Sequence, residues 1–461
     1  MIDSIPMIYV SQAHLPISYV QLNFSIQHTE FNSALAYLKP ETHQGLQSSA
    51  LRIMSQRQLQ RGTLNMGRAT FINEIEALGT EIQLTHRGYA HSLGAVALTR
   101  TLPRLIKLFH DALTKPSLDK EELEQSKRAY ISELEARYDD DQSLAWLWLL
   151  RRLHQDHPLW ADYCIEAKHI TVLSTDHIRQ AWPFIFNRKC FLPSFTSDAT
   201  QDTLAHLIDP LYNDLNINSG ESQFQACRLP SLAKLSKSTL TLVNKPGKQQ
   251  ALLFIAHPTI APTHPQALAL YVALCALGGT FSAPLMQEIR VKRGLSYGAH
   301  AGIKGEAHSR YVCLHCSPEA PQATQALLVM LQVYQRGGRG ELSDTEINFA
   351  KSYLINAHPF SIETPAMRAG LSANACLMGL DPKLLLTQAD RIKKLSIDEI
   401  RQAAQDLLAS QGLEILVFGD QKQIGTQLIN ELQSILPLEQ VLRLEAKDEP
   451  TKALTRRSLN D

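Results

Sequence analysis

Leu277 to Ile303, LGGTFSAPLMQEIRVKRGLSYGAHAGI, is the stretch that decides the expected fold of this chain. Its pattern predicts a Gly-Gly turn, a helix from Ser282 to Lys292, a break at Gly294 and a strand that begins at Tyr297. Glycine at position 294 suits the left-handed backbone with which many helices end. The chain is therefore expected to reverse direction between the helix and the strand.

The predicted helix has one apolar face. Leu285, Met286 and Ile289 recur at a spacing of three to four residues, so they should be buried together. Lys292 and Arg293 fall in the last turn, where cations interact favourably with the helix dipole. These features alone indicate ordinary local structure.

Arg290 and Tyr297 lie on either side of the predicted reversal. A fixed cation at a helix end and a phenol at a strand start can face the same space, where both can donate hydrogen bonds to a carbonyl oxygen or to the oxyanion it becomes. The alternative is a dipole-stabilising Arg and a half-buried strand Tyr. Spacing alone favours this alternative, because exposed Arg residues near helix C-termini are common.

The run LGGTFSAPLMQEIRVKRGLSYG resembles the C-terminal half of pitrilysin/insulinase-type zinc peptidases, in the two-subunit bacterial branch related to mitochondrial processing peptidase. In that family, a helix ending in Arg leads through a Gly-Leu-x-Tyr turn to a Tyr. The Arg/Tyr pair completes an active site whose zinc lies in the other half of the assembly. The resemblance assigns this pair to Arg290 and Tyr297.

Composition excludes several classes of function. The chain has 461 residues, 44% of them hydrophobic, which is enough for a large core and two domains. Its 45 basic and 45 acidic residues give no net charge, so neither a nucleic-acid groove nor an anionic membrane surface is expected. No apolar run is long enough for membrane insertion. The first residues lack a basic region followed by an apolar core, which predicts a cytoplasmic protein, or a periplasmic one if translation starts upstream.

An internal repeat indicates a duplicated α+β unit. LSTDHIRQA at Leu173 is echoed by LSIDEIRQA at Leu395, and EELEQSKRAY at Glu121 by TEINFAKSYL at Thr345, at nearly the same offset. Residues 5–28 predict two strands around a turn, and residues 239–256 mirror this N-terminal hairpin. The resemblance implies that each half-unit is a mixed β-sheet with helices packed on one face.

The predicted domains follow the repeat. We expect an N-terminal α+β domain over residues 1–215 and a homologous C-terminal domain over residues 237–445. The polar, turn-rich residues 216–236 are expected to form a linker. Residues 446–461 are expected to form a disordered polar tail.

Catalytic members of the family carry H-x-x-E-H on a helix, because residues at i and i+4 can bind one zinc ion while the Glu activates water. This chain contains neither H-x-x-E-H nor H-E-x-x-H. Counting back from Gly62-Thr63, which matches a family Gly-Thr, places the motif at residues 53–57. Ile53 and Arg57 then occupy the two His positions and Gln56 that of the base.

The family's third zinc ligand is a Glu on a later helix, and Glu133 stands at about the right distance along the chain. Ile cannot bind zinc, Arg carries a fixed positive charge and Gln cannot accept a proton. One remaining carboxylate does not make a zinc site. We therefore expect Glu133 to be a solvated helix residue that pairs with a neighbour such as Arg137.

Three other motifs are weaker. Cys313 and Cys316 form C-x-x-C on a predicted strand, where they should face opposite sides. His154 and His157 form H-x-x-H at a predicted helix end, which favours a cap over a ligand pair. The GGT of residues 278–280 precedes a helix but lacks the other residues of a nucleotide-binding loop.

The sequence thus predicts a zinc-less, non-catalytic subunit of a heterodimeric endopeptidase, inactive alone, whose homologous partner carries H-x-x-E-H and zinc. Arg290 and Tyr297 would contact the carbonyl of a peptide or unfolded-protein substrate. One alternative is a non-enzymatic scaffold or binding protein derived from the family. Another is a subunit of a protease that matures a small peptide.

Overall fold

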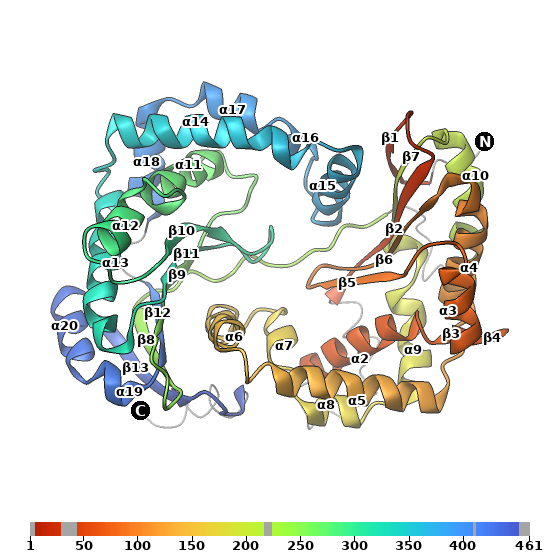
Figure 1. Ribbon diagram of the computed structural model, residues 1–461, viewed down its shortest axis with the longest axis horizontal. Coiled ribbons are helices and arrows are strands. Elements are labelled where there is room, and N and C mark those ends of the chain that lie inside the picture. Colours follow the sequence, from red (N-terminus) through yellow and green to blue (C-terminus); the bar gives the residue numbers. More distant parts are fainter. Residues whose placement is uncertain (1–4, 29–43, 216–223, 409–411, 451–461) are drawn as a thin grey trace. The chain divides into compact units, whose positions relative to one another are not determined.

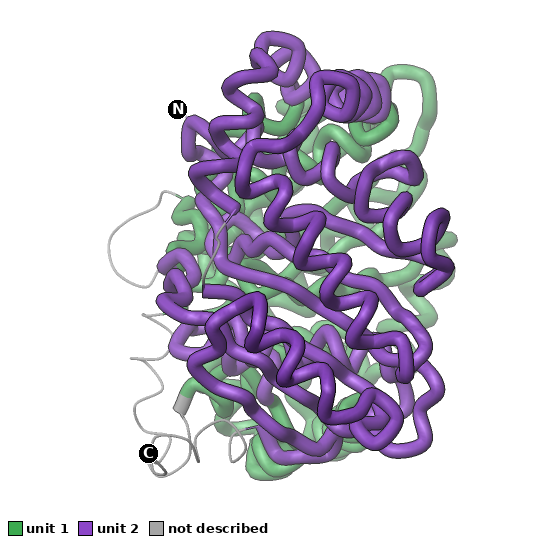
Figure 2. The backbone as a smooth tube through the Cα atoms, turned by 90° about the vertical axis from the view of Figure 1, so that its left-hand side faces the viewer, with its two compact units in different colours: residues 1–135, 165–229, 359–386 green, residues 136–164, 230–358, 387–461 purple. Residues whose placement is uncertain are grey.

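The computed structural model describes residues 5–28, 44–215, 224–408 and 412–450 of the chain. They form two compact units (Figure 2). Each unit contains one large β-sheet. The first unit comprises residues 1–135, 165–229 and 359–386, and the second comprises residues 136–164, 230–358 and 387–461.

The first unit has a five-stranded mixed sheet in the order β1-β7-β2-β6-β5. β7 runs parallel to β1 and antiparallel to β2, and the other pairs are antiparallel. The strands and the short ribbon beside them are β1 (Ile8–Ser11), β2 (Ile17–Ser25), β3 (Gly62–Thr63), β4 (Met66–Gly67), β5 (Gln83–Arg87), β6 (Ala90–Leu98) and β7 (Phe191–Ser197). The helices are α2 (Gln44–Gln58), α3 (Arg68–Glu76), α4 (Leu102–Thr114), α5 (Lys120–Ala136), α8 (Ala167–Thr171), α9 (Thr175–Ile185), α10 (Gln201–Asp214), α15 (Pro365–Leu377) and α16 (Lys383–Leu386).

The second unit has a six-stranded mixed sheet in the order β10-β11-β9-β12-β8-β13. Its strands are β8 (Ser238–Asn244), β9 (Leu252–Pro258), β10 (Ala299–Lys304), β11 (Tyr311–Cys316), β12 (Glu414–Gly419) and β13 (Leu438–Glu445). Its helices are α6 (Asp141–Leu153), α7 (Trp160–Tyr163), α11 (Ala267–Gly278), α12 (Pro284–Met286), the π-helix η3 (Gln287–Val291), α13 (Ala323–Gly338), most of α14 (Asp344–Ser361), α17 (Gln388–Lys394), α18 (Ile397–Leu407), α19 (Gln421–Ile424) and α20 (Gln427–Ile435).

The two sheets share one topology. β8, β12, β9, β11 and β10 follow one another as β1, β7, β2, β6 and β5 do, with the same parallel and antiparallel pairs, and β13 extends the second sheet. The helices that begin in the repeated sequences also match: Ser174 and Ser396 each cap a helix with a capping box, closed by His177 and by Glu399 respectively. This agreement supports the predicted duplication and the α+β fold class.

The hairpins predicted over residues 5–28 and 239–256 are not formed, although the strands are present. β7 lies between β1 and β2, and β12 lies between β8 and β9, so the strands consecutive in sequence are not paired with each other. Every residue of β7 and β12 is buried, whereas β1 is partly exposed along its length. A strand buried on both faces belongs in the sheet interior, and the chain reaches it only after the intervening helices.

Most helices of each unit cover one face of its sheet, as predicted, and one 13-residue helix in each unit packs on part of the other face (Figure 1). In the first unit this helix is α15, which packs on β7, β1 and β2. In the second unit it is α6, which packs on β9 and β12. Each of these helices comes from the other half of the sequence. Residues 136–164, predicted to belong to the N-terminal domain, are part of the second unit, and residues 359–386, predicted to belong to the C-terminal domain, are part of the first unit.

The predicted linker and tail are only partly described. Residues 216–223 and 451–461 lie outside the described residues. Within the predicted linker, Cys227 is buried and its backbone N–H donates to Leu377 O at 2.9 Å. In the predicted tail, Ala446 is buried and accepts a hydrogen bond from Trp148 Nε1 at 3.4 Å. Both segments are therefore more ordered at these points than their polar composition suggests.

Candidate functional site

The segment that carries Arg290 is shorter and more irregular than predicted. Instead of one helix from Ser282 to Lys292, α12 covers three residues and continues as the π-helix η3, in which the Lys292 N–H donates to Gln287 O at 2.9 Å. The strand begins at Ala299, two residues later than predicted. π-Helices are rare in proteins, and those that do occur are often found at functional sites.

Buried residues hold this segment in place. Leu285, Ile289 and Met286 are buried as predicted, and Leu295 is buried just beyond the helix end. Gly294 has φ +63°, the left-handed conformation expected of it, and its N–H donates to Arg290 O at 3.1 Å. The backbone at both ends of the Arg290–Tyr297 span is thus anchored.

Arg290 lies between two aromatic rings. Its guanidinium carbon is 4.3 Å from the ring centroid of Tyr297 and 5.2 Å from that of Phe281. Both rings are exposed, Tyr297 at 84% and Phe281 at 59%. Tyr297 is therefore not the half-buried strand residue of the alternative interpretation. The structure brings the predicted pair together, with cation–π contacts that limit the freedom of the guanidinium.

Neighbouring charges leave Arg290 available. Glu288 forms ion pairs with Lys292, at 2.5 Å between Oε1 and Nζ, and with Arg293. Hydrogen bonds from these two cations hold the pKa of Glu288 below its ordinary value. Within the described part of the chain, Arg290 makes no ion pair, so its N–H groups can bind an oxygen of another molecule.

The sequence did not predict that Phe281 contacts Arg290. It follows the Gly-Gly turn and lies outside the apolar periodicity of the helix, so no pattern marked it. Its backbone oxygen accepts a hydrogen bond from Gln287 Nε2 at 2.9 Å, which ties the turn to the π-helix. An aromatic residue close to a Gly-Gly turn was the one signal that the sequence offered for it.

The degenerate zinc positions lie on α2 in the first unit. Ile53 is 8% exposed and belongs to the apolar core of that unit. Arg57 forms an ion pair with Glu133, and its guanidinium carbon is 4.7 Å from the ring centroid of Tyr130. The partner of Glu133 is thus Arg57, a residue far away in sequence, and not the predicted neighbour Arg137. Arg57 places its fixed charge where a metal would meet this carboxylate.

Gln56, at the position of the base, is a structural cross-link. It is buried, and its Nε2 donates to Thr85 O at 2.8 Å and to Ser92 O at 3.2 Å. Its Oε1 lies 3.1 Å from His91 Nδ1. Burial holds the pKa of His91 well below its ordinary value, so this imidazole is neutral at pH 7. Gln56 joins α2 to β5 and β6 and has no proton-accepting role.

These residues do not fit a zinc ion. The two positions that should supply imidazoles hold an apolar side chain and a cation already paired with the remaining carboxylate. In the residues that the structure describes, no group of three or more His, Cys, Asp or Glu residues could hold a metal ion.

The weaker motifs are structural. Cys313 and Cys316 lie in the cores on opposite faces of β11, as predicted. His154 is the C-cap of α6, as predicted, and its Nδ1 is 2.9 Å from Leu150 O. Burial lowers its pKa to about 4, which keeps the ring neutral. His157 Nε2 is 2.8 Å from Pro230 O. Among the helices in the described ranges, none combines the length and the apolar character that crossing a membrane requires.

Known proteins share this fold. Residues 194–354 match the family described as "Peptidase M16 inactive domain". The crystal structure of a peptidase M16 inactive domain from Pseudomonas fluorescens superposes with a TM-score of 0.76 at 18% identity, covering 90% of this chain and 96% of that one. The crystal structure of a protease from Helicobacter pylori gives 0.73 at 14% identity, covering 89% and 96%.

Two curated relatives align over most of the chain. The "Non-peptidase homolog YmxG" of Helicobacter pylori is 21% identical over 397 residues, covering 86% of this chain and 87% of that protein. The "Uncharacterized zinc protease SCO5738" of Streptomyces coelicolor is 23% identical over 366 residues, covering 76% of each.

The fold and the family match point to one class of protein, the M16 peptidase homologues. Residues 194–354 match the inactive domain of these peptidases, and over most of its length the chain is similar to pitrilysin-like M16 homologues. This similarity is consistent with a non-catalytic subunit.

Proposed function

We propose that this chain is the zinc-less subunit of a two-subunit peptidase, in which Arg290 and Tyr297 bind the carbonyl oxygen of a peptide or unfolded-protein substrate beside the partner's zinc. The observation that carries the proposal is the arrangement of Arg290. Its guanidinium is held between two exposed rings, while the nearby cations Lys292 and Arg293 are both paired with Glu288. Such a preorganised donor is what oxyanion stabilisation requires.

The partner in this proposal is a homologous chain that carries H-x-x-E-H. It supplies the metal and the base that Ile53, Gln56 and Arg57 cannot supply here. The relative named a non-peptidase homologue supports a chain of this type that does not cleave peptides by itself.

The first experiment is purification of the native chain with whatever binds it, followed by mass spectrometry. The proposal expects a homologue with H-x-x-E-H in near-equal amount, and peptide cleavage only by the complex. Recovery of the chain without such a partner would contradict it.

The second experiment tests Arg290 in that complex. Arg290→Ala should lower turnover on the order of 10²-fold, the usual loss for one oxyanion donor. The matched control is Arg293→Ala, which removes a cation from the same turn that is already paired with Glu288. Its turnover should stay near that of the wild type. Equal turnover of Arg290→Ala and wild type would refute the catalytic role.

A non-enzymatic scaffold is the second candidate. Two observations on α2 favour it. Gln56 is buried and hydrogen-bonded to a neighbouring strand, and Arg57 forms an ion pair with Glu133, so the residues at the zinc and base positions serve to hold the helix in place. A scaffold predicts a stable complex whose activity, if any, does not depend on Arg290.

A further inference from the structure

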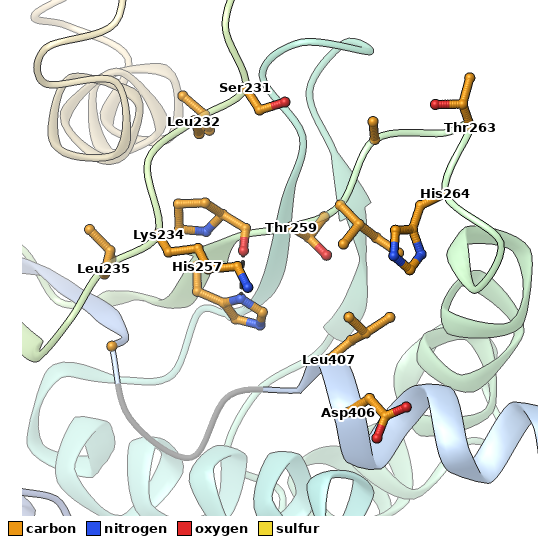
Figure 3. Close-up of a pocket in the computed structure, with 14 residues that line it drawn as sticks. Ser231, Leu232, Lys234, Leu235, His257, Thr259, Thr263, His264, Asp406 and Leu407 are labelled. Atoms are coloured by element: carbon orange, nitrogen blue, oxygen red, sulfur yellow. Dashed lines mark hydrogen bonds between the residues drawn. The ribbon is translucent and has the colours of Figure 1, made fainter.

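A hollow in the second unit lies away from the Arg290 segment. It is lined by the stretch before β8, the end of β9 with the loop that follows, and the end of α18 (Figure 3). Its volume is about 450 Å³, within the range of small-molecule sites. None of the sequence motifs falls in it.

The body of the hollow is apolar. Its walls contain several aliphatic side chains from all three segments, namely Leu232, Leu235, Pro258, Ile260, Ala261 and Leu407. Gly412 closes one corner: it has φ +78°, and a Cβ added there would lie 2.1 Å from Leu235 O, so that corner is tightly packed. An occupant must therefore present apolar groups to the middle of the hollow.

Opposite charges lie at its two sides. Figure 3 shows Lys234 on one side of the hollow and Asp406 on the other. Lys234 forms no ion pair within the part of the chain that the structure describes. Asp406 accepts one hydrogen bond on each oxygen, from Gln266 Nε2 at 2.6 Å and from Gln402 Nε2 at 2.8 Å. These bonds orient the carboxylate and leave it free acceptor positions.

His257 supplies a buried polar group. It is 4% exposed and lies on the Lys234 side of the hollow (Figure 3). Its Nδ1 is 2.9 Å from Pro258 O, and a carbonyl can only accept, so Nδ1 carries the proton. Nε2 is then an acceptor, and it has no hydrogen-bond partner among the described residues. Burial lowers the pKa of this imidazole to about 4, so it stays neutral.

We propose that this hollow binds a short apolar peptide with free termini, such as a dipeptide of aliphatic residues. Its carboxylate would pair with Lys234, its ammonium group with Asp406, and its side chains would fill the apolar middle. His257 Nε2 would accept a hydrogen bond from a ligand N–H. A nucleotide fits poorly, because the lining offers one lysine and no arginine for its phosphates.

The inference does not depend on the proposed peptidase function. It predicts binding by the isolated chain, without a partner subunit, and at a place distinct from Arg290. If the dipeptide binds while no partner exists, the inference stands and the proposed function fails. If the complex cleaves peptides but the chain binds no dipeptide, the reverse holds.

The test is isothermal titration calorimetry of the full chain with leucyl-leucine and with its N-acetylated and C-amidated forms. Each blocked form should bind about tenfold more weakly than the free dipeptide, since it loses one charge-assisted hydrogen bond. Lys234→Gln should bind the free dipeptide about tenfold more weakly and no longer distinguish it from the amide. Asp406→Asn should likewise stop distinguishing it from the acetylated form.

The matched control is Lys237→Gln. Lys237 lies three residues from Lys234 but is paired with Glu439 at 2.7 Å and does not line the hollow. It should leave all three affinities unchanged. Both test positions are on the rim, and thermal unfolding of each variant verifies that it is folded. No heat of binding up to millimolar leucyl-leucine, or equal binding of free and blocked peptides by the wild type, would overturn the proposal and leave a water-filled hollow only.

Discussion

Restoring the lost zinc ligands is the sharpest test of the altered site on α2. The double substitution Ile53→His, Arg57→His places two imidazoles at i and i+4 on one helix face. Arg57 already contacts Glu133, so its replacement frees the carboxylate that can serve as third ligand. We expect this variant to bind one zinc ion at this site, where Ile53 and Arg57 of the wild type supply no ligand.

The cost in stability can be worked from the structure. Arg57 and Glu133 are 26% and 52% exposed, so loss of their ion pair costs at most about 1 kcal/mol. Loss of the cation–π contact with Tyr130 costs about 0.5–1 kcal/mol. A histidine at the buried position 53 costs about 3 kcal/mol. The zinc-free variant should therefore lose about 3.5–5 kcal/mol, a large part of a typical stability.

Zinc should restore part of this loss. At a concentration 100 times its Kd, a ligand stabilises the folded state by about 2.7 kcal/mol, which corresponds to a rise in Tm of roughly 5–10 °C. The assay is thermal unfolding with and without zinc, combined with the zinc content of the protein after gel filtration. The control adds Glu133→Gln, which removes the third ligand and should reduce the zinc-dependent shift. A folded double variant that binds no zinc would refute the assignment of residues 53 and 57 to the ligand positions.

Three further predictions concern stability. His154 and His257 are buried with pKa values lowered to about 4. In the unfolded chain these histidines take up protons near pH 6.5, whereas in the folded chain they do not. Urea titrations should therefore show the free energy of unfolding falling by about 2 kcal/mol per histidine between pH 7 and 5. His257→Gln should reduce this fall by the contribution of one histidine. Gln56→Ala should lower the free energy of unfolding by about 2–3 kcal/mol, because it breaks a partly buried hydrogen bond to β5 and a buried one to β6. An unchanged urea midpoint would contradict the cross-link. Gly305→Ala should lower the free energy of unfolding by more than about 1 kcal/mol, since Gly305, in the β10–β11 turn, has φ +80° and a Cβ there would lie 2.1 Å from a backbone oxygen. The control is Gly302→Ala, because a Cβ at Gly302 has no atom within 4 Å. Its free energy of unfolding in the same urea titration should be close to that of the wild type.

Local signals in the sequence were sufficient for several elements. The capping serines 174 and 396 begin their helices where the repeat predicts, because a cap acts on the backbone of its own first turn. Gly294 ends its helical segment with positive φ, because only the local backbone requires it. The alternation of β11 put Cys313 and Cys316 on opposite faces, as a period of two requires. The absence of zinc ligands at residues 53 and 57 is likewise a matter of residue chemistry alone.

Only the tertiary structure decided which distant segments meet. The insertion of β7 between β1 and β2 depends on burial of that strand on both faces, and no turn next to it in sequence encodes this. The ion pair between Arg57 and Glu133 joins two helices that lie far apart in the chain. Phe281 gains its role from the position of its ring beside Arg290. Sequence periodicity shows which face of an element is apolar. How those faces are buried together decides which strands pair, which unit contains α6 and α15, and which side chains surround Arg290.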